Sequence, residues 1–294
     1  MDDVFNLAKT AIGRGTTALS IFQSSDGSFP LYPCTKSPPS SQADPIFLTA
    51  SVVLACGDVL PKTVLSNALD YIERREWLDH LWNWHGFPPD ADDSAVALAA
   101  LIKFGRCDGR TANVLRRFWR DQNGPFSTWP SSFLQGRESP DPVVNCNVLF
   151  CLQIGQCYQQ REREAIENLI KSVVSRGTHH SDYYCCVSSL LYAAARAGLG
   201  VIDFGVMEAS FIAPGTHVQY YAEALNSQRF IPPDAVSYVI RQQEINGGWP
   251  GAPWVSDKDG DYLSPAYATA LAIQLLYRFV DQAPGMQLSQ AISK

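Results

Sequence analysis

The chain is organised by a repeated pattern, in which a turn or an acidic residue is followed by a helix rich in small apolar residues. Five clear copies begin at Asp44, Asp90, Asp141, Asp182 and Tyr262. The differences between these positions place successive starts 46, 51, 41 and 80 residues apart, and a weaker copy from His217 divides the longest interval. Self-similarity at about 40–50 residues is typical of helical repeat architectures. The pattern therefore predicts six repeated units.

Each apolar helix is paired with a more polar one. In the polar helices, apolar residues such as Leu65, Leu69 and Ile72 recur at spacings of three and four, which is typical of one buried stripe. The apolar helices are hydrophobic on nearly all sides, as expected when both faces are covered. The predicted polar helices are 4–22, 62–75, 110–121, 160–174, 204–211 and 234–243.

Six helix pairs predict an all-α fold. We expect residues 1–294 to form a single domain, an α6–α6 toroid of twelve helices with an inner ring inside an outer ring. A closed ring is favoured over an open solenoid because it needs no capping repeats and so has a reason to stop at six units.

Three turns between helices share a glutamine, a glycine and an aromatic residue. They begin at Gln23, Gln122 and Gln243 and read QSSDGSF, QNGPF and QEINGGW. The glycine permits a tight turn, and the aromatic ring is expected to pack back onto the helix whose end the glutamine amide caps. These turns are interpreted as packing staples.

Composition and charge exclude several classes of protein. Lys and Arg number 23 against 29 Asp and Glu, and the net charge of -6 argues against nucleic-acid binding. The longest apolar runs, such as Ala95–Ile102, are far shorter than the roughly 20 residues of a membrane span. The acidic start MDDVFNL does not resemble a signal peptide, so we expect a cytoplasmic protein.

Cysteine and histidine spacing predicts no metal site. None of the eight cysteines forms a CxxC pair, and the five histidines form neither an HExxH motif nor a cysteine–histidine finger. The cysteines are therefore expected to be reduced thiols.

The densest acidic cluster lies in PPDADDSAVALAAL, where Asp90, Asp92 and Asp93 begin the second apolar helix. Acids at a helix N-terminus are favoured by about 0.3–1 kcal/mol each, which would explain one or two of them. A third carboxyl repels the others, and burial and like charge both favour retention of a proton. The residues alone leave two interpretations open: a charged helix start in an ion-pair network, or a carboxylic acid that donates a proton.

The segment DADDSA resembles the DxDD motif of class II terpene cyclases, the squalene–hopene and diterpene cyclases. The three glutamine–glycine–aromatic turns resemble the QW repeats of that superfamily, and the helix pairs resemble its toroid. The resemblance covers essentially the whole chain. It implies that Asp92 donates a proton to a terminal alkene or epoxide of an isoprenoid substrate, while Asp90 and Asp93 hold the acid through hydrogen bonds. We expect no cofactor, and Mg²⁺ is an option if the substrate is a diphosphate.

Aromatic and amide residues near helix starts are the expected walls of the substrate pocket. Aromatic faces stabilise a carbocation without a lone pair that attacks it. The predicted substrate-binding residues are Trp82, Trp84, Asn145, Asn147, Tyr184, Tyr221 and Tyr267. His85 precedes the acid cluster, and we interpret it as a residue of the connecting loop.

The resemblance has two departures. Class II cyclases usually place their pocket between two helical domains, and this chain has room for one. A homodimer, a partner domain or the chain's own loops at Ser127–Pro140 or Pro250–Leu263 would complete the pocket. The chain also lacks the DDxxD motif of ionising terpene synthases, so a diphosphate would be retained. Arginines that could bind one are Arg116, Arg117, Arg120 and Arg137.

Two other functions are compatible with a toroid. Protein prenyltransferase β-subunits bind zinc, but Asp182 and Cys185 have the wrong spacing for their ligands. A non-catalytic toroid that binds a ligand or a protein is the second alternative. Three carboxyls at one helix start favour the cyclase, because a binding module has no need for them.

Overall fold

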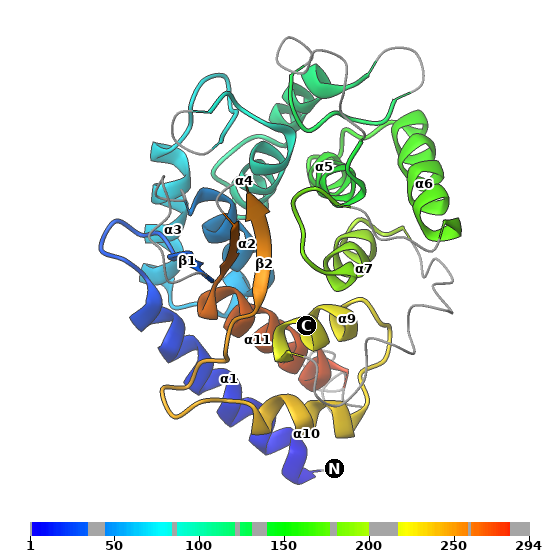
Figure 1. Ribbon diagram of the computed structural model, residues 1–294. Helices are drawn as coiled ribbons and strands as arrows, with labels where there is room; N and C mark the ends of the chain where they lie inside the picture. The colour runs from blue at the N-terminus through cyan, green and yellow to red at the C-terminus, as the bar shows by residue number, and fades with distance from the viewer. Residues whose placement is uncertain are drawn as a thin grey trace, which may run out of the picture.

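Six apolar helices form a closed inner ring in the computed structural model, which describes residues 2–34, 45–83, 87–120, 124–130, 140–176, 181–199, 217–257 and 260–282. They are α2 (Ile46–Cys56), α4 (Ala91–Lys103), α5 (Pro142–Ile154), α7 (Val187–Arg196), α9 (Val218–Asn226) and α11 (Pro265–Asp281). Each packs against the next, and α11 packs against α2, which closes the ring (Figure 1). The hydrophobic core runs through all six helices.

The more polar helices cover this ring from outside. They are α1 (Asp2–Phe22), α3 (Lys62–Arg74), the 3₁₀ helix η2 (Gly109–Phe118), α6 (Gln160–Ser175) and α10 (Pro233–Arg241), and a short η1 (Gly57–Val59) follows α2. The helix expected at 110–121 is thus a 3₁₀ helix that begins one residue earlier. The helix expected at 204–211 lies outside the described residues. Alternation of inner and outer helices brings the starts of the inner helices to one end of the ring.

A small antiparallel sheet lies at that end, although the hydrophobic pattern predicts only helices. Its strands β1 (Tyr32–Pro33), β2 (Pro253–Asp257) and β3 (Gly260–Leu263) are ordered β1-β3-β2. The segment before α7 is extended because its backbone pairs with β2: Ser256 N donates to Tyr183 O at 2.9 Å, and Cys185 N to Trp254 O at 3.1 Å. For this reason α7 begins at Val187 and not at Asp182.

A recurring hydrogen bond joins the two rings at the aromatic residue of each of the three predicted staples and also at Trp82, which belongs to none of them. The backbone N–H of a fully buried aromatic residue donates to a polar side chain in the first turns of an inner helix. The pairs and their distances are Phe29–Thr49 at 3.0 Å, Trp82–Ser94 at 2.9 Å, Phe126–Asn145 at 2.8 Å and Trp249–Thr269 at 2.9 Å. This bond gives each short polar residue of an otherwise apolar helix a structural role.

The glutamines of these turns reach farther than the sequence suggests. Gln243 Nε2 donates to Gly247 O at 2.8 Å and to Ala11 O on α1 at 2.9 Å, so it does not cap its own helix. Gln23 in the same way binds its own turn and Val64 of α3. At Gly247, φ is +88° and a side chain would collide with Arg14 O, so glycine is required for the close approach. Gln122 lies outside the described residues.

Thr269→Val tests the stapling hydrogen bond. The substitution keeps the shape of the side chain but leaves the buried N–H of Trp249 without its acceptor. We expect the free energy of unfolding to fall by about 1–3 kcal/mol, measured by urea denaturation. Thr10→Val on the exposed face of α1 is the matched control and should change stability by less than about 0.5 kcal/mol. Equal effects of the two substitutions would contradict the interpretation.

Candidate active site

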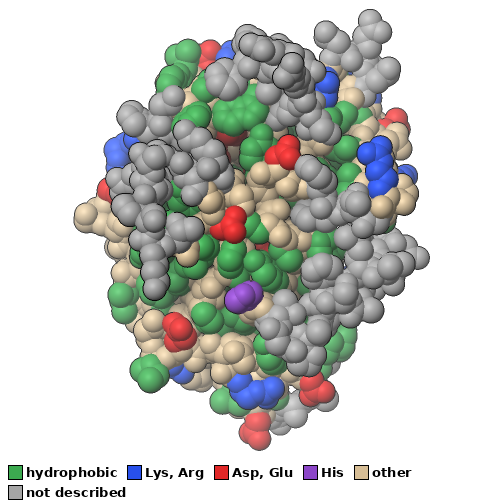
Figure 2. Space-filling view, viewed as in Figure 1, with side chains coloured by type: hydrophobic (Ala, Val, Ile, Leu, Met, Phe, Trp, Pro, Cys, Tyr) green, Lys and Arg blue, Asp and Glu red, His purple; other side chains and the backbone are tan. Residues whose placement is uncertain are grey.

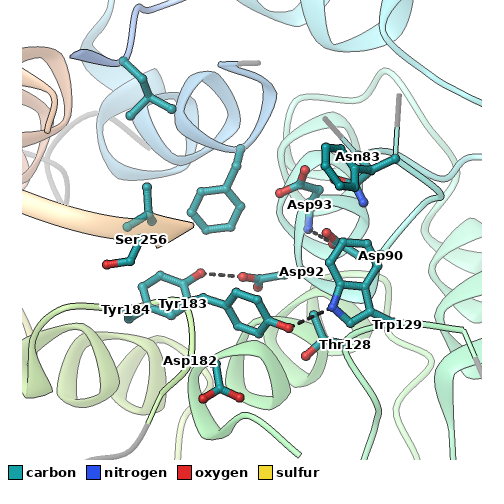
Figure 3. A pocket seen from close by; sticks show the side chains of 14 residues that line it. Asn83, Asp90, Asp92, Asp93, Thr128, Trp129, Asp182, Tyr183, Tyr184 and Ser256 are labelled. Carbon is teal, nitrogen blue, oxygen red and sulfur yellow. Dashed lines mark hydrogen bonds between the residues drawn. The ribbon is translucent and has the colours of Figure 1, made fainter. Parts of the chain in front are cut away.

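A pocket of about 350 Å³ opens at the end of the ring where the inner helices begin. The acids of the DADDSA segment lie on one side of it, and aromatic rings face them (Figure 3). Its lining residues are Leu31, Phe47, Asn83, Phe87, Asp90, Asp92, Asp93, Thr128, Trp129, Asp182, Tyr183, Tyr184, Val255 and Ser256. Thr128 and Trp129, with Val255 and Ser256, come from the loops that the sequence analysis proposed as covers.

Asp92, in the first turn of α4, accepts hydrogen bonds from two neighbouring side chains. Its Oδ1 accepts a hydrogen bond from Asn147 Nδ2 at 2.8 Å, and its Oδ2 accepts one from Tyr184 Oη at 2.5 Å. Burial raises the pKa of Asp92 to about 6, although both hydrogen bonds lower it. Asp141 also raises this pKa and Arg196 lowers it. The carboxyl therefore holds a proton far more readily than an exposed aspartate does.

Arg196 acts on Asp92 through an intermediate amide. Its guanidinium donates to Asn147 Oδ1 at 2.6 Å, while the amide nitrogen of the same side chain donates to Asp92. This arrangement polarises the amide toward the carboxyl without placing the cation against it. The ionised form of the carboxyl is thereby stabilised, and no direct ion pair with Arg196 displaces its proton.

Asp90 and Asp93 have different roles. Asp90 caps α4, because its Oδ1 accepts from Asp93 N at 2.8 Å. Asp93 is 5% exposed, and its Oδ2 has no hydrogen-bond partner within the described ranges. Burial and the neighbouring Asp90 and Asp92 raise the pKa of Asp93 well above its ordinary value. The cluster thus retains protons through both burial and like charge.

An aromatic cluster extends from the pocket into the ring. Trp254 of β2 stacks on Tyr267 with a centroid distance of 3.7 Å and lies 5.3 Å from Phe47 and 6.4 Å from Tyr184. Phe47 in turn meets Tyr184 edge-on at 6.1 Å. At the pocket mouth, Trp129 Nε1 donates to Tyr183 Oη at 2.8 Å. These rings give the interior a π-rich surface suited to a passing cation.

The structure separates the predicted wall residues into two groups. Tyr184 lines the pocket, Asn147 holds Asp92 from behind, and Tyr267 belongs to the aromatic cluster. Trp82 and Asn145 instead take part in hydrogen bonds that hold the helices together. Trp82 Nε1 donates to Ile72 O. The Asn145 amide accepts from Phe126 N and donates to Phe126 O and Asp141 O.

Tyr221 does not line the pocket. It packs against Tyr238 of α10, with 5.0 Å between the ring centroids. Trp84 and His85 lie outside the described residues. Sequence reasoning missed Phe47, Trp129 and Trp254. Phe47 is the second residue of α2, as Asp92 is of α4, and this shared position is a signal that could have found it.

The described lining of this pocket contains no basic side chain, and Arg196 lies behind it on Asn147. On this face of the molecule, hydrophobic side chains gather over the middle, and the visible Lys and Arg side chains lie toward the edge (Figure 2). Of the arginines proposed as a clamp, Arg116 pairs with Glu162 at 2.6 Å and Arg117 with Asp79 at 3.1 Å. Arg137 lies outside the described residues.

Among the described residues, no three His, Cys, Asp or Glu side chains are grouped to hold a metal ion. None of the described helices is both long and apolar enough to cross a membrane.

Comparison with solved structures identifies proteins of the same fold. The type II terpene cyclase MstE from Scytonema superimposes with a TM-score of 0.74 at 14% identity, over 95% of this chain and 99% of that chain. A protein from Actinoplanes gives 0.70 at 16% identity, over 92% and 99% of the two chains. The ent-copalyl diphosphate synthase from Streptomyces platensis gives 0.55 at 18% identity, over 80% of this chain and 50% of that one.

The sequence itself matches no family model and no curated protein. At these identities the structural likeness shows the fold. It confirms a mostly helical architecture like that of class II terpene cyclases.

The pH dependence of stability tests the state of Asp92. Its pKa is about 6 in the folded state and about 4 in the unfolded state. The contribution of Asp92 to the free energy of unfolding is therefore fully present below about pH 4 and is lost as pH rises through about 6. Two units correspond to about 3 kcal/mol. We therefore expect the stability of the native chain, relative to Asp92→Asn, to fall by about 3 kcal/mol between about pH 4 and 7 in urea unfolding. A flat difference would contradict the raised pKa.

Proposed function

We propose that the chain is a terpene cyclase-like enzyme of class II, which starts cyclisation of a linear isoprenoid by protonating a terminal alkene. The observation that carries this proposal is the buried carboxyl of Asp92, held at an aromatic pocket with a pKa raised to about 6. The shared fold with type II terpene cyclases supports it.

Proton donation from Asp92 follows from its surroundings. An alkene is a very weak base, so the acid must act in a pocket where water does not compete for the proton. As the proton leaves, the hydrogen bonds from Asn147 and Tyr184 strengthen against the forming carboxylate. Burial favours the protonated form of Asp92, and the two hydrogen bonds stabilise the carboxylate that forms when the proton is donated.

The other two acids support this role. Asp90 fixes the first turn of α4 and so the direction of Asp92, because it binds the backbone of Asp93. Asp93 has a strongly raised pKa and adds negative potential when it ionises, which keeps a proton within the cluster. The substrate cation would then lie against Phe47, Tyr184 and Trp254, whose ring faces each stabilise a cation by about 0.5–2 kcal/mol.

The described pocket lining favours a prenylated substrate without a diphosphate. No Lys or Arg is among the described residues that line the site, so they offer an anionic diphosphate no counter-charge. Two further Scytonema cyclase structures contain geranylgeranyl dihydroxybenzoate, named as substrate, and merosterolic acid A, named as product. A geranylgeranyl chain on an aromatic acid is therefore the first substrate to test. Mg²⁺ has no place in this reaction unless the substrate is a diphosphate.

Asp92→Asn tests the proposal directly. The variant keeps the size of the side chain but cannot donate the acidic proton, so we expect turnover of geranylgeranyl dihydroxybenzoate to fall by at least about a hundredfold. In D₂O the native enzyme should place one deuterium at the initiating carbon of the cyclic product, measured by mass spectrometry. Geranylgeranyl diphosphate with and without Mg²⁺ is the comparison substrate.

Asp70→Asn is the control. This exposed carboxylate on the outer helix α3 pairs with Arg106 and does not line the pocket. It should leave turnover unchanged. Binding of the prenyl substrate with no cyclic product from the native chain would favour the non-catalytic binding module. Unchanged turnover in Asp92→Asn would remove the assigned proton donor.

A further inference from the structure

A second buried carboxyl lies inside the ring, at a place that the initiation step does not use. Glu223 of α9 is fully buried. Its carboxylate accepts hydrogen bonds from Ser188 and Ser189 of α7, the latter at 3.3 Å, and from the hydroxyl of Tyr267 on α11. Hydroxyl groups of the two flanking inner helices thus surround one acid of the helix between them.

This arrangement is costly if its purpose is structural. Among the residues that the structure describes, no Lys or Arg forms an ion pair with Glu223 or lowers its pKa. Burial raises that pKa to about 7, so the group exists partly as a carboxylate near neutral pH. An uncompensated buried charge destabilises a fold, and an apolar residue or an amide would join the same helices at a lower cost. A carboxylate without a counter-cation suits a site where a cation forms during the reaction.

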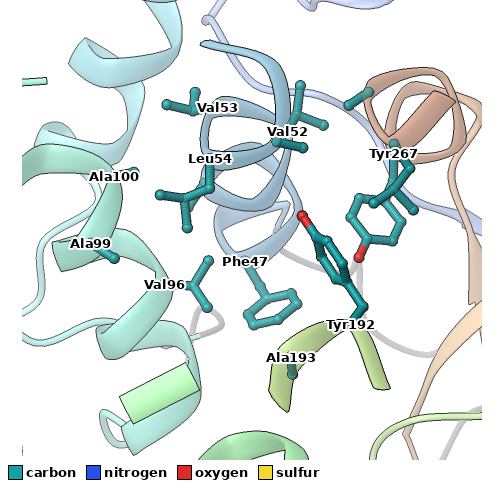
Figure 4. Packing of buried hydrophobic residues seen from close by; sticks show 14 of the residues in the cluster. Phe47, Val52, Val53, Leu54, Val96, Ala99, Ala100, Tyr192, Ala193 and Tyr267 are labelled. Carbon is teal, nitrogen blue, oxygen red and sulfur yellow. The ribbon is translucent and has the colours of Figure 1, made fainter. Parts of the chain in front are cut away.

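The position of Glu223 relates it to Asp92 through one aromatic residue. Trp254 lies against Tyr184, whose hydroxyl binds Asp92, and stacks on Tyr267, whose hydroxyl binds Glu223. The tyrosine rings of two tyrosine–carboxylate pairs therefore pack against the same indole ring. Figure 4 shows that Phe47 and Tyr267 both point into the interior of the ring, with Tyr192 beside them.

We infer that Tyr267 and Glu223 form the proton-accepting pair that ends the cyclisation, an inference that rests on the proposed function. The oxygen of Tyr267 takes a proton from a carbon next to the final cationic carbon. The electrons of that C–H bond become the new C=C bond, and the phenolic proton of Tyr267 passes to Glu223. Between turnovers Glu223 returns this proton to water and Asp92 regains one from water, so the product is an isomer of the substrate.

Glu223→Gln and Tyr267→Phe test this pair. Glutamine keeps the size and shape of Glu223 and one accepting oxygen but is not basic, and phenylalanine keeps the ring that stacks on Trp254. With geranylgeranyl dihydroxybenzoate in D₂O, both variants should still place deuterium at the initiating carbon. We expect the share of the main alkene product to fall at least about tenfold, with alcohols from water capture or isomeric alkenes in its place.

Tyr192→Phe is the matched control. This buried tyrosine lies in the same interior, but its hydroxyl donates to Gln274 at 2.9 Å and not to Glu223. Its product profile should equal that of the native enzyme. A thermal melt confirms that each variant is folded, and if Glu223→Gln does not fold, Tyr267→Phe alone decides the test.

The outcomes distinguish failure of the proton-accepting pair from failure of the proposed function. A native product profile from folded Glu223→Gln and Tyr267→Phe, with Asp92→Asn inactive, would overturn this inference and leave the proposed function intact. Absence of cyclic product and of deuterium incorporation in the native enzyme itself would overturn both. An altered product with retained deuteration supports the pair, because a merely structural defect would lower the rate without changing where the proton is lost.

Discussion

The site depends on a carboxyl group that is buried and has a pKa raised to about 6. Asp92 loses the solvation of water when α4 joins the inner ring, and this loss raises its pKa. Asn147 and Tyr184 replace part of that solvation with two directed hydrogen bonds from neighbouring elements of the ring. Arg196 lowers the pKa of Asp92, but its guanidinium binds the Asn147 amide and forms no ion pair with the carboxyl.

Closure of the helix ring makes this geometry possible. Asn147 lies on α5 and Tyr184 lies just before α7, so the three side chains meet only because these helices are neighbours in the ring. The staple hydrogen bonds fix the first turns of the inner helices, as Asn145 shows by binding the backbone of Phe126. The acidic residues can then repel one another without displacing the helix start.

Much of the candidate site was predictable, because local patterns carry the information. The spacing of apolar residues indicates which helices are buried, and the DADDSA segment places three acids at the start of one of them. Asn145 and Asn147 were both expected near the acids, but residues two apart point in nearly opposite directions on a helix at about 100° per residue. Asn147 reaches Asp92, while Asn145 faces the staple turn.

The sequence by itself determined the helical repeat, the pairing of apolar with polar helices and the place of three acids at the start of one apolar helix, because all three follow from the order of residues within short segments. Only the tertiary structure decided that Trp254 of a small sheet enters the ring and contacts Phe47, Tyr184 and Tyr267. These four residues come from distant parts of the chain. Their contacts depend on the way the ring closes, and no local pattern of hydrophobicity specifies which aromatic residue fills its centre.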